Sequence, residues 1–297
     1  KLCISQPYLS AAIKRIEQQI GAPLFERKSS SVVPTEIGYE YIRALEQITD
    51  IEKKFAAKIA DITDMEQGSL DIGCSVYCST YVIPQILKEF SSLYPKIKIS
   101  LIDAGDAQLK TNLVNEEIDF IIGTKAEDKK SYDIFPLLTE NVLLAVPVDF
   151  DCNKGLEDYQ INPSMLSDKN FDLNSVPEIS IDNFENEKFI VLKNGNDMNI
   201  QAHEIFNKNN FIPKLAFQLD ILASAYALTV SGNGVCFVTD TMFKNKHIND
   251  NIVLYRLENA TQRTVYLIKK KSKYTTHAIK KFIDTATKTK SEKGELL

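Results

Sequence analysis

An amphipathic segment that starts at Ser5 most constrains what this chain can fold into. Ser5 suits the N-cap of a helix, and Pro7 suits its first turn, where a missing backbone N–H costs little. Apolar side chains recur at helical spacing and predict one face packed on a core: Leu9, Ile13, Ile16 and Ile20. The opposite face carries small or polar side chains that are free to enter a groove: Gln6, Ser10, Ala11 and Lys14.

A hairpin and a second helix are predicted after Gly21, which is a natural helix end. Leu24 and Phe25 return apolar side chains to the core before a strand-like run at 31–33. Thr35, with Glu36 behind it, suits the start of the next helix. On periodicity alone, an ordinary helix and hairpin within a globular domain is the simpler interpretation.

The spacing of the whole region favours a more specific interpretation. It reads Ser5-Gln6-x-x-Leu9-Ser10-x-x-Ile13-x-x-Ile16-Glu17-x-x-x-Gly21-x-x-Leu24-Phe25-x-Arg27 and closes with Thr35-x-x-Gly38. This pattern closely resembles the DNA-binding domain of LysR-type transcriptional regulators, and the resemblance covers nearly the whole chain. It implies a winged helix-turn-helix in residues 1–34 of a homo-oligomeric, ligand-responsive bacterial transcription factor. Scaffold helices precede the recognition helix of such motifs, so roughly two dozen further residues are expected ahead of Lys1.

By this resemblance, the recognition helix and the wing contact double-stranded operator DNA. The matching positions are Ser5, Gln6, Ser10 and Lys14 in the helix, and Arg27 and Ser30 in the wing. Glutamine can read adenine in the major groove, whereas Ser, Lys and Arg mostly hold phosphates. Ala11 and Ala12 depart from the larger polar residues of many relatives, so the base preference does not transfer. The net charge of −5 is no objection, because residues 1–43 hold six Lys or Arg against four Asp or Glu.

Residues 35–67 are predicted to form a linker helix. No Gly or Pro occurs from Tyr39 to Gln67, which is enough chain for a single helix of about 45 Å. Large side chains repeat every seven residues along it and predict a dimerisation seam: Tyr41, Ile48, Phe55 and Ile62. The alternative is that this stripe packs on the chain's own core. In the resembled family the helix pairs two subunits, which implies a homodimer or homotetramer.

From residue 68 onward, short apolar runs alternate with amphipathic segments, a pattern typical of an α/β domain with a mostly parallel sheet. Leu70–Cys74 is predicted as the first strand and Tyr81–Leu93 as the first helix. The segment resembles the LysR-type effector domain, a periplasmic-binding-protein-like fold of two α/β subdomains around a ligand cleft. The resemblance implies a subdomain I of residues 68–145 and 241–297 and a subdomain II of residues 146–240. The hinges are then expected at Leu143–Val148 and near Val238.

Ligands of open α/β folds bind at the carboxyl ends of strands, which places a small-molecule effector site in four loops. The candidate effector-binding residues are Ser75, Tyr77, Cys78, Ser79, Thr80, Asp103, Gly105, Asp106, Thr124, Asn194 and Asn196. Asp106 departs from the family, in which Ser or Thr often meets an anionic effector. Its carboxylate would repel another carboxylate, which favours an amine-bearing, zwitterionic or neutral ligand. The alternative is that Asp106 only caps a helix beginning at Ala107.

Enzymatic and metal-binding functions find little support in the sequence, and no cofactor is expected. Its three histidines are scattered without metal-ligand spacing, and no nucleophile-elbow or phosphate-loop pattern occurs. The five cysteines are expected to be reduced thiols, with redox sensing by Cys78 as the alternative. The polar segment Asp149–Pro177 is predicted to be an exposed loop, with room for a short helix, and is assigned no function.

Two functions from different classes remain. One is a DNA-binding transcriptional regulator, activator or repressor, that is controlled by a small-molecule effector and has RNA polymerase as a further candidate partner. The other is a solute-binding protein of the periplasmic-binding-protein type without a DNA-binding role. A secreted protein has no use for the recognition helix or the seam, and five unpaired cysteines suit an oxidising compartment badly. The regulator is therefore favoured. A cytoplasmic location without a membrane partner is expected, because no apolar run approaches membrane-spanning length and no signal peptide is visible.

Overall fold

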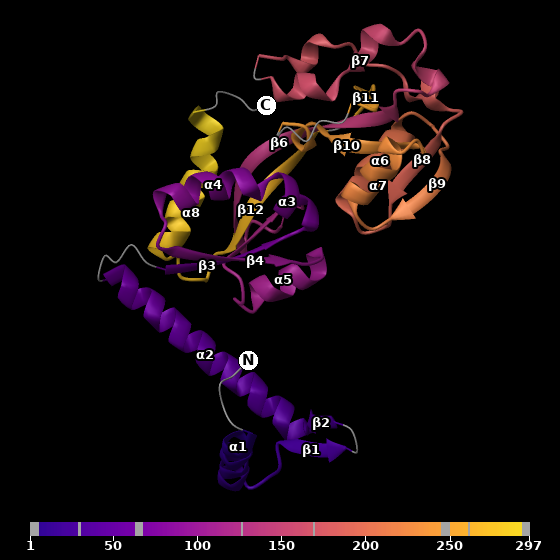
Figure 1. Ribbon diagram of the computed structural model, residues 1–297. Coiled ribbons are helices and arrows are strands. Elements are labelled where there is room, and N and C mark those ends of the chain that lie inside the picture. Colours follow the sequence, from indigo (N-terminus) through magenta and orange to yellow (C-terminus); the bar gives the residue numbers. More distant parts are fainter. Residues whose placement is uncertain are drawn as a thin grey trace. The chain divides into compact units, whose positions relative to one another are not determined.

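The computed structural model describes residues 6–28, 31–62, 68–125, 127–168, 170–244, 250–260 and 262–292. The chain divides into two compact units, Lys1–Met65 and Glu66–Leu297, and each is described by itself (Figure 1). Two of the predicted DNA contacts, Ser5 and Ser30, lie outside the described residues.

The first unit consists of a helix, a hairpin and a long helix. α1 spans Gln6–Ile20, β1 (Phe25–Lys28) pairs antiparallel with β2 (Ser31–Pro34), and α2 spans Glu36–Ile62. α1 ends at Gly21, whose φ of 81° is a left-handed conformation that glycine adopts without strain. The predicted helix, hairpin and second helix are therefore present in the predicted order.

Two side chains connect the elements of this first unit. The carboxylate of Glu17 accepts hydrogen bonds from the backbone N–H of Leu24 at 2.7 Å and of Phe25 at 3.3 Å. At the start of α2, the hydroxyl of Thr35 accepts a hydrogen bond from the N–H of Gly38 at 2.9 Å, as an N-cap does. α1 is thus fastened to the hairpin by a charge-assisted pair of hydrogen bonds.

The second unit is built on one long strand, β6 (Tyr132–Pro147), which two groups of strands share. The strand order is β4-β3-β5-β12-β6-β10-β8-β9. We call the group on one side the first lobe: β3 (Gly68–Cys74), β4 (Ile97–Asp103), β5 (Phe120–Gly123) and β12 (Gln262–Lys270). The other group is the second lobe: β7 (Gln160–Ile161), β8 (Lys188–Leu192), β9 (Lys214–Leu219), β10 (Val235–Thr239) and β11 (Ile252–Tyr255).

The chain crosses between the lobes at places that differ from the predicted hinges. Residues 132–141 of β6 pair with β12 in the first lobe, whereas residues 142–147 pair with β10 and β11 in the second. One crossing therefore lies between Asn141 and Val142, earlier than Leu143–Val148, and the other lies between β11 and β12 rather than near Val238. The apolar run 142–146 is buried as a central strand of the second lobe, so it lies within that lobe rather than between the two.

Helices cover both lobes (Figure 1). Those of the first lobe are α3 (Val76–Tyr81), α4 (Ile83–Leu93), α5 (Asp106–Val114) and α8 (His277–Glu292). Those of the second lobe are α6 (Asp197–Lys208) and α7 (Leu222–Val230). The helix predicted at Tyr81–Leu93 is preceded by the separate turn of α3, because Pro84 opens a new helix there. No helix among the described residues has the length and apolar character needed to cross a membrane.

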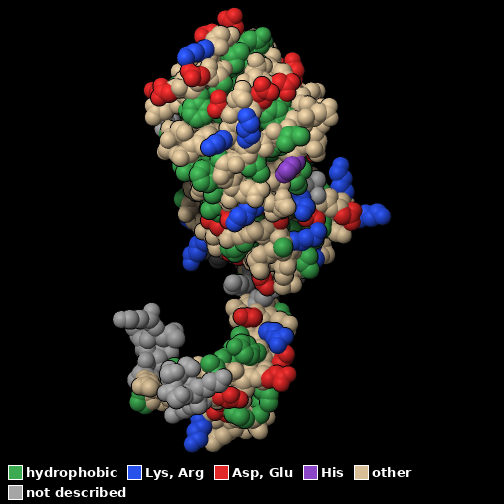
Figure 2. Space-filling view, turned by 90° about the vertical axis from the view of Figure 1, so that its right-hand side faces the viewer, with side chains coloured by type: hydrophobic (Ala, Val, Ile, Leu, Met, Phe, Trp, Pro, Cys, Tyr) green, Lys and Arg blue, Asp and Glu red, His purple; other side chains and the backbone are tan. Residues whose placement is uncertain are grey.

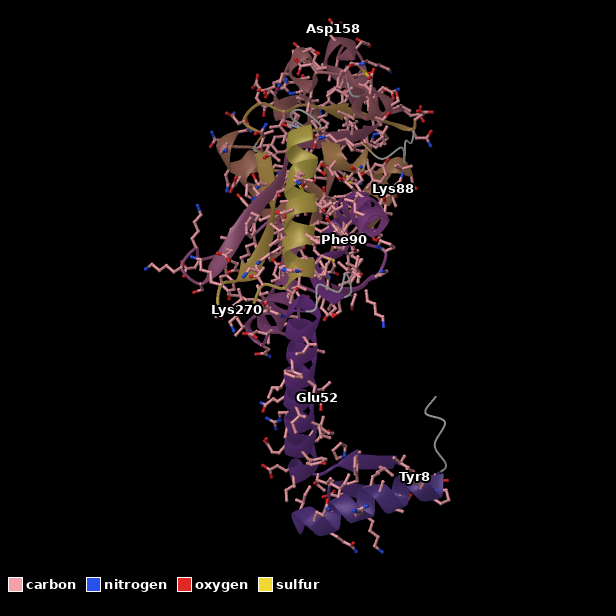
Figure 3. The ribbon with its side chains drawn as sticks, turned by 90° about the vertical axis from the view of Figure 1, so that its left-hand side faces the viewer. Tyr8, Glu52, Lys88, Phe90, Asp158 and Lys270 are labelled. Atoms are coloured by element: carbon pink, nitrogen blue, oxygen red, sulfur yellow. The ribbon has the colours of Figure 1, made fainter. Side chains whose placement is uncertain are left out.

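Each lobe has its own aromatic core. In the first lobe Phe282 of α8 lies against Phe90 and Phe120, with ring centroids 5.0 and 4.9 Å away, and Phe90 points toward α8 in Figure 3. In the second lobe Phe189 contacts Phe206 at 5.4 Å between centroids. Buried aromatic pairs of this kind stabilise a core beyond their area alone. The arrangement agrees with the predicted two-lobed α/β fold class.

The segment Asp149–Pro177 is mostly exposed or half-buried, as predicted, but it is more ordered than a loop with one short helix. Its described residues form four short 3-10 turns, and Leu166 and Val176 are buried in the core of the second lobe. The amide of Asn153 donates to the carbonyl of Pro147 at 2.7 Å and accepts from the hydroxyl of Tyr255 at 2.8 Å, both inside the protein. Buried hydrogen bonds of this kind anchor an otherwise polar segment. Acidic side chains gather over the end of the second lobe that this region covers (Figure 2).

Replacing Gly234 with alanine is expected to destabilise the second lobe. Its φ of 145° is unfavourable for a residue with a Cβ atom, and an added Cβ would overlap the carbonyl oxygen of Lys188 in β8. We expect a loss of about 3 kcal/mol in the free energy of unfolding. Gly155→Ala is the matched control, because φ there is 79° with nothing within 4 Å, so it tests backbone strain alone. Equal losses in urea unfolding would contradict the predicted clash.

Candidate functional site

The side of α1 that was predicted to read DNA is accessible. Gln6, Ser10 and Lys14 follow one another at intervals of four residues and are all exposed. Arg27 lies in β1, on the hairpin next to α1, and its side chain is not described. The predicted apolar stripe behind them is only partly packed, because Ile13 and Ile16 are half-buried whereas Leu9 and Ile20 are 45% and 41% exposed. Within its own unit, α1 therefore presents more apolar surface than the sequence pattern predicts.

The seam predicted on α2 lies exposed within its own unit. Ile48 and Phe55 are 52% and 66% exposed. Ile51, which forms a second series at seven-residue spacing with Ile37 and Ala44, is 65% exposed. Tyr41 is half-buried, and the side chain of Ile62 is not described. A row of large apolar side chains in water is unfavourable on a single helix and favourable between two.

A pocket of about 430 Å³ lies between the two lobes. Loops that follow β3, β4 and β5 line it from the first lobe, and the starts of α6 and α7 line it from the second. Nine of the predicted effector residues line it: Ser75, Tyr77, Thr80, Asp103, Gly105, Asp106, Thr124, Asn194 and Asn196. Its volume is typical of sites for small molecules.

Cys78 and Ser79, the other two predicted effector residues, do not line this pocket. Both belong to α3, and a helix that turns Tyr77 and Thr80 toward the pocket turns the residues between them away. Cys78 is fully buried in the core of the first lobe, and burial raises the pKa of its thiol to about 12. A thiol that stays protonated is a poor nucleophile, which argues against redox sensing there. Among the described residues, no three His, Cys, Asp or Glu are placed to hold a metal ion.

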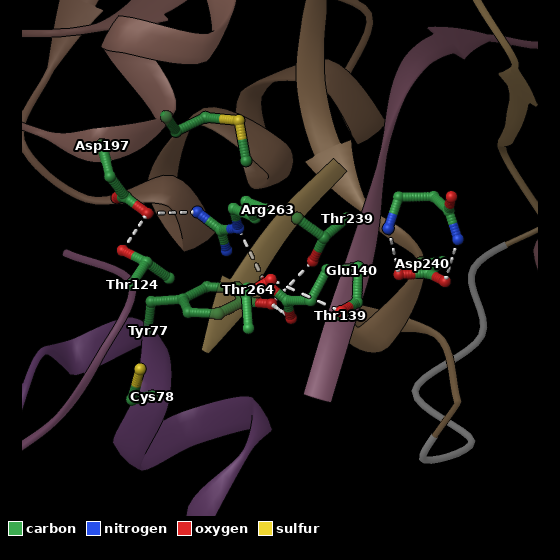
Figure 4. A network of polar contacts seen from close by, with 12 residues as sticks. Tyr77, Cys78, Thr124, Thr139, Glu140, Asp197, Thr239, Asp240, Arg263 and Thr264 are labelled. Atoms are coloured by element: carbon green, nitrogen blue, oxygen red, sulfur yellow. Dashed lines mark hydrogen bonds and ion pairs between the residues drawn. The ribbon is translucent and has the colours of Figure 1, made fainter. Parts of the chain in front are cut away.

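A buried guanidinium, that of Arg263 in β12, lies at the wall of the pocket and holds two carboxylates (Figure 4). Its Nε donates to Oε2 of Glu140 at 2.7 Å, and its Nη1 donates to Oδ2 of Asp197 at 2.6 Å. Burial by itself lowers the pKa of Arg263, but the two carboxylates more than offset this and hold the pKa above its ordinary value. The side chain therefore carries a permanent positive charge.

This network joins the two lobes. Asp197 begins α6 in the second lobe, and its Oδ2 also accepts a hydrogen bond of 2.5 Å from the hydroxyl of Thr124 in the first lobe. On the other side of Arg263, the hydroxyl of Tyr77 donates to Glu140 and lies 2.7 Å from the hydroxyl of Thr239 in β10. The guanidinium lies 4.3 Å above the ring of Tyr77. Burial, followed by the charge of Glu140, raises the pKa of Tyr77, so this hydroxyl stays protonated.

A second buried carboxylate marks the place where β6 passes between the lobes. Asp240, just after β10, accepts hydrogen bonds of 3.0 Å from both the backbone N–H and the side-chain amide of Asn141. Lys244 lies 3.1 Å away and compensates the charge of Asp240. The end of β10 is thereby fastened to the crossing point of β6 (Figure 4).

Most charges in the pocket wall are already paired. Lys193 lies 2.8 Å from Asp220, and Glu127 lies 2.7 Å from Lys110. Asp106 and Lys125 are exceptions, because both line the pocket and neither makes a hydrogen bond or ion pair to any described residue. Partial burial raises the pKa of Asp106; nearby Lys125 lowers it, and the charges of Asp197 and Glu127 raise it. A positively charged group of a ligand would relieve this destabilised carboxylate.

Asp106 does not act as a cap for the helix that follows it. α5 begins at Asp106 itself, the N-cap is Gly105, and no side chain caps the helix. The alternative role predicted from the sequence is therefore not observed. An acidic first residue still interacts favourably with the positive end of its helix.

Arg263, Glu140 and Asp197 were not predicted from the sequence. One signal was present, since Glu140 lies between two apolar runs and Arg263 lies in a strand-like segment. Charged residues in the strands of a core are rarely buried without a partner. The two lie in strands 123 residues apart, and only the pairing of β12 with β6 brings them opposite each other.

Two family models match the chain. The model described as the LysR substrate binding domain matches residues 63–290, and the model described as the bacterial regulatory helix-turn-helix protein, lysR family, matches residues 1–39. The second match favours a regulator over a solute-binding protein that lacks a DNA-binding role.

Curated relatives agree with the family models. The chain is 27% identical to the uncharacterized HTH-type transcriptional regulator YcgK of Bacillus subtilis (strain 168), over 95% of this chain and 86% of that protein. It is 23% identical to the HTH-type transcriptional activator CmpR of Synechocystis sp. (strain ATCC 27184 / PCC 6803 / Kazusa), over 96% of this chain and 86% of that one.

Solved structures share the fold. Full-length CbnR complexed with its target DNA has a TM-score of 0.69 and 15% identity, over 97% of this chain and 91% of that one. The effector binding domain of QuiR in complex with shikimate has a TM-score of 0.59 and 16% identity, over 76% of this chain and 98% of that one. With both domain models matched in order along its length, the chain belongs to the LysR family of DNA-binding transcriptional regulators controlled by small-molecule effectors.

Proposed function

We propose that this regulator binds operator DNA through α1 and the neighbouring hairpin, dimerises through α2, and changes its DNA contacts when a positively charged small molecule binds between the two lobes. The observation that carries the effector class is the unpaired carboxylate of Asp106 in the wall of the pocket. Partial burial destabilises this carboxylate even with Lys125 nearby, so it discriminates against anions and favours ammonium groups. Because it acts on chromosomal DNA, we place the protein in the cytoplasm, with RNA polymerase as a further partner.

Control by the effector follows from the way the pocket is built. Both lobes line it, and Asp197 of the second lobe is bonded to Thr124 and Arg263 of the first. A ligand in this place contacts both lobes and favours whichever lobe arrangement it binds more tightly. In a dimer joined by α2, such a change alters the spacing of two reading heads on DNA.

Two substitutions on α1 test the proposed DNA contacts. Gln6→Ala is expected to cost about 1–3 kcal/mol of binding free energy on the preferred operator and to relax the preference at one base pair. Lys14→Ala is expected to weaken binding to all sequences and to reduce the salt dependence by about one counter-ion. Gln19→Ala serves as the control, because Gln19 is exposed on a different side of α1.

The measurement is operator binding by fluorescence anisotropy at several salt concentrations, with the full-length protein. Unchanged affinity for both α1 variants, or an equal loss for Gln19→Ala, would place the DNA contacts elsewhere.

A charge on the α2 seam is expected to separate the subunits. In Phe55→Asp, dimerisation would bury a carboxylate among apolar side chains, which costs several kcal/mol. Light scattering coupled to size exclusion should then report a monomer. Ala56→Asp adds the same charge one residue away on the exposed flank of the helix and should leave the dimer intact. If both variants dissociate, or neither does, α2 does not pair through this face.

Removing the charge of Asp106 is expected to abolish recognition of ammonium compounds. The wild-type protein should be stabilised by such a compound and should change its DNA footprint when it binds, whereas Asp106→Asn should need at least about tenfold more ligand for both effects. Asp220→Asn, which removes a paired carboxylate from the same pocket, is the control. Identical footprints with and without every stabilising ligand would rule out effector control through this pocket.

The pH dependence of stability gives a second measure of Asp106. Folding raises the pKa of Asp106, so its ionisation destabilises the folded state relative to the unfolded state. This loss of stability is absent below the ordinary pKa of about 4, grows as the pH rises, and is complete above the folded-state pKa. Without ligand, Asp106→Asn should therefore melt at a higher temperature than the wild type at neutral pH. This difference in Tm should shrink as the pH is lowered.

A further inference from the structure

The two carboxylates bound to Arg263 differ in burial. Glu140 is fully buried, as is the guanidinium, and Glu140 alone supplies the counter-charge that a buried cation requires. The side chain of Asp197 is 34% exposed, lines the pocket and belongs to the other lobe. Glu140 is therefore a fixed counter-ion, whereas Asp197 occupies a place that a ligand can reach.

Arg263 also has hydrogen-bonding capacity that the protein does not use. Its Nη2 is buried and has no hydrogen-bond partner among the described residues, and in Figure 4 it is the guanidinium nitrogen without a dashed line. Asp197 engages Nη1 through one oxygen, which it shares with Thr124. A guanidinium binds a carboxylate best through two parallel hydrogen bonds, and with Nε engaged by Glu140 the fork left for this is Nη1 with Nη2. Asp197 thus forms a weaker contact than this cation can make.

The charges of the pocket limit what could replace Asp197. A simple anion would meet repulsion from Asp106 in the same wall, which nearby Lys125 offsets only in part. A simple cation would satisfy Asp106 but would leave the spare donor of Arg263 unpaired. A molecule that carries both an ammonium and a carboxylate satisfies both Asp106 and the spare donor of Arg263. The first residues of α7 line the same pocket, and because no side chain caps this helix, its first backbone N–H groups are potential donors for an anionic group.

We propose that Asp197 is an internal ligand that occupies the place of the effector's carboxylate on Arg263, and that the effector is a small zwitterion of the free amino acid class. This inference rests on the proposed function, which concerns the positively charged group of the ligand, and adds a site for its carboxylate. The ammonium group binds at Asp106, while the carboxylate displaces Asp197 and engages Nη1 and Nη2. Displacement also breaks the bond between Asp197 and Thr124, so binding releases the link between the lobes.

An internal competitor has a testable signature, because removing it should improve binding. The twenty common L-amino acids are screened against the full-length protein by thermal shift, and affinities for the strongest are measured by calorimetry. The same measurements use the matching amine that lacks the carboxylate. We expect the wild type to bind the amino acid at least about tenfold more tightly than the amine. Asp197→Asn should bind the amino acid several-fold more tightly than the wild type, with no gain for the amine.

Two further variants separate this mechanism from general charge effects. Asp220→Asn removes a carboxylate from the same pocket but not from Arg263, and it should not reproduce the gain. The double variant Arg263→Gln with Glu140→Gln keeps the buried pair neutral and should lose the preference for the carboxylate while retaining the amine. The double change avoids leaving Glu140 as an uncompensated buried charge.

The outcomes distinguish this inference from the function on which it rests. Equal affinity for amine and amino acid, or weaker amino acid binding in Asp197→Asn, overturns the internal-ligand proposal and leaves an ammonium effector at Asp106 in place. An equal gain in Asp220→Asn overturns it as well, because general repulsion then accounts for the change. If no amino acid and no amine binds, the zwitterion proposal and the positively charged effector are both overturned, while DNA binding through α1 still stands.

Discussion

The ion pair between Arg263 and Glu140 is the contact around which the effector unit is organised. The two residues are direct partners in the pairing of β12 with β6, one position before β6 passes from the first lobe to the second. Burying two charges is unfavourable unless each is fully compensated, and removing one partner of such a pair costs about 3–5 kcal/mol. The register of β12 on β6 is therefore tightly constrained where the lobes meet. Tyr77 and Thr239 bond to the same cluster and bring α3 and β10 to it.

Burial separates the permanent contacts at this junction from those that can exchange. Glu140 and Asp240 are closed off from water and hold β6 to its neighbours on either side of the crossing point. Asp197 and Asp106 face the pocket, where water and ligands can compete for them. A response to an effector requires contacts of the second kind, because a ligand shifts an equilibrium only through interactions that differ between the two states. The buried carboxylates of Glu140 and Asp240 thus hold the strands in place, and the carboxylates of Asp197 and Asp106 are the ones that can respond to an effector.

The DNA-binding unit shows the same division between fixed and available groups. Glu17 and Thr35 satisfy backbone N–H groups and fasten α1, the hairpin and α2 together. Gln6, Ser10 and Lys14 make no such bond to any described residue and remain exposed on one side of α1. Along α2, Phe55 and Ile51 are likewise exposed, so this unit presents both a polar surface suited to DNA and an apolar surface suited to a second copy.

The sequence by itself determined the elements whose causes are local. The stripe of α1, the glycine at its end, the long α2 and the alternation of strands and helices follow from periodicity and capping, and the spacing from Ser5 to Gly38 was specific enough to indicate the family. Nine of the eleven predicted effector residues line the pocket because the carboxyl ends of parallel strands meet at one edge of a sheet. Cys78 and Ser79 do not line the pocket, because a one-residue step on a helix turns a side chain by about 100°.

Only the tertiary structure decided what depends on residues far apart in the chain. The crossing point of β6 lies at Asn141 rather than in the apolar run after it, because pairing with β10 and β11 buries that run in the second lobe. The composition of the long segment after β6 predicts a loop, but a buried hydrogen bond between Asn153 and Tyr255 anchors that segment to the core. Arg263 and Glu140 meet only through strand pairing, and Asp197 reaches them from the other lobe. Such contacts leave no periodic signal, because their geometry is set by the register between strands and by the packing of whole lobes.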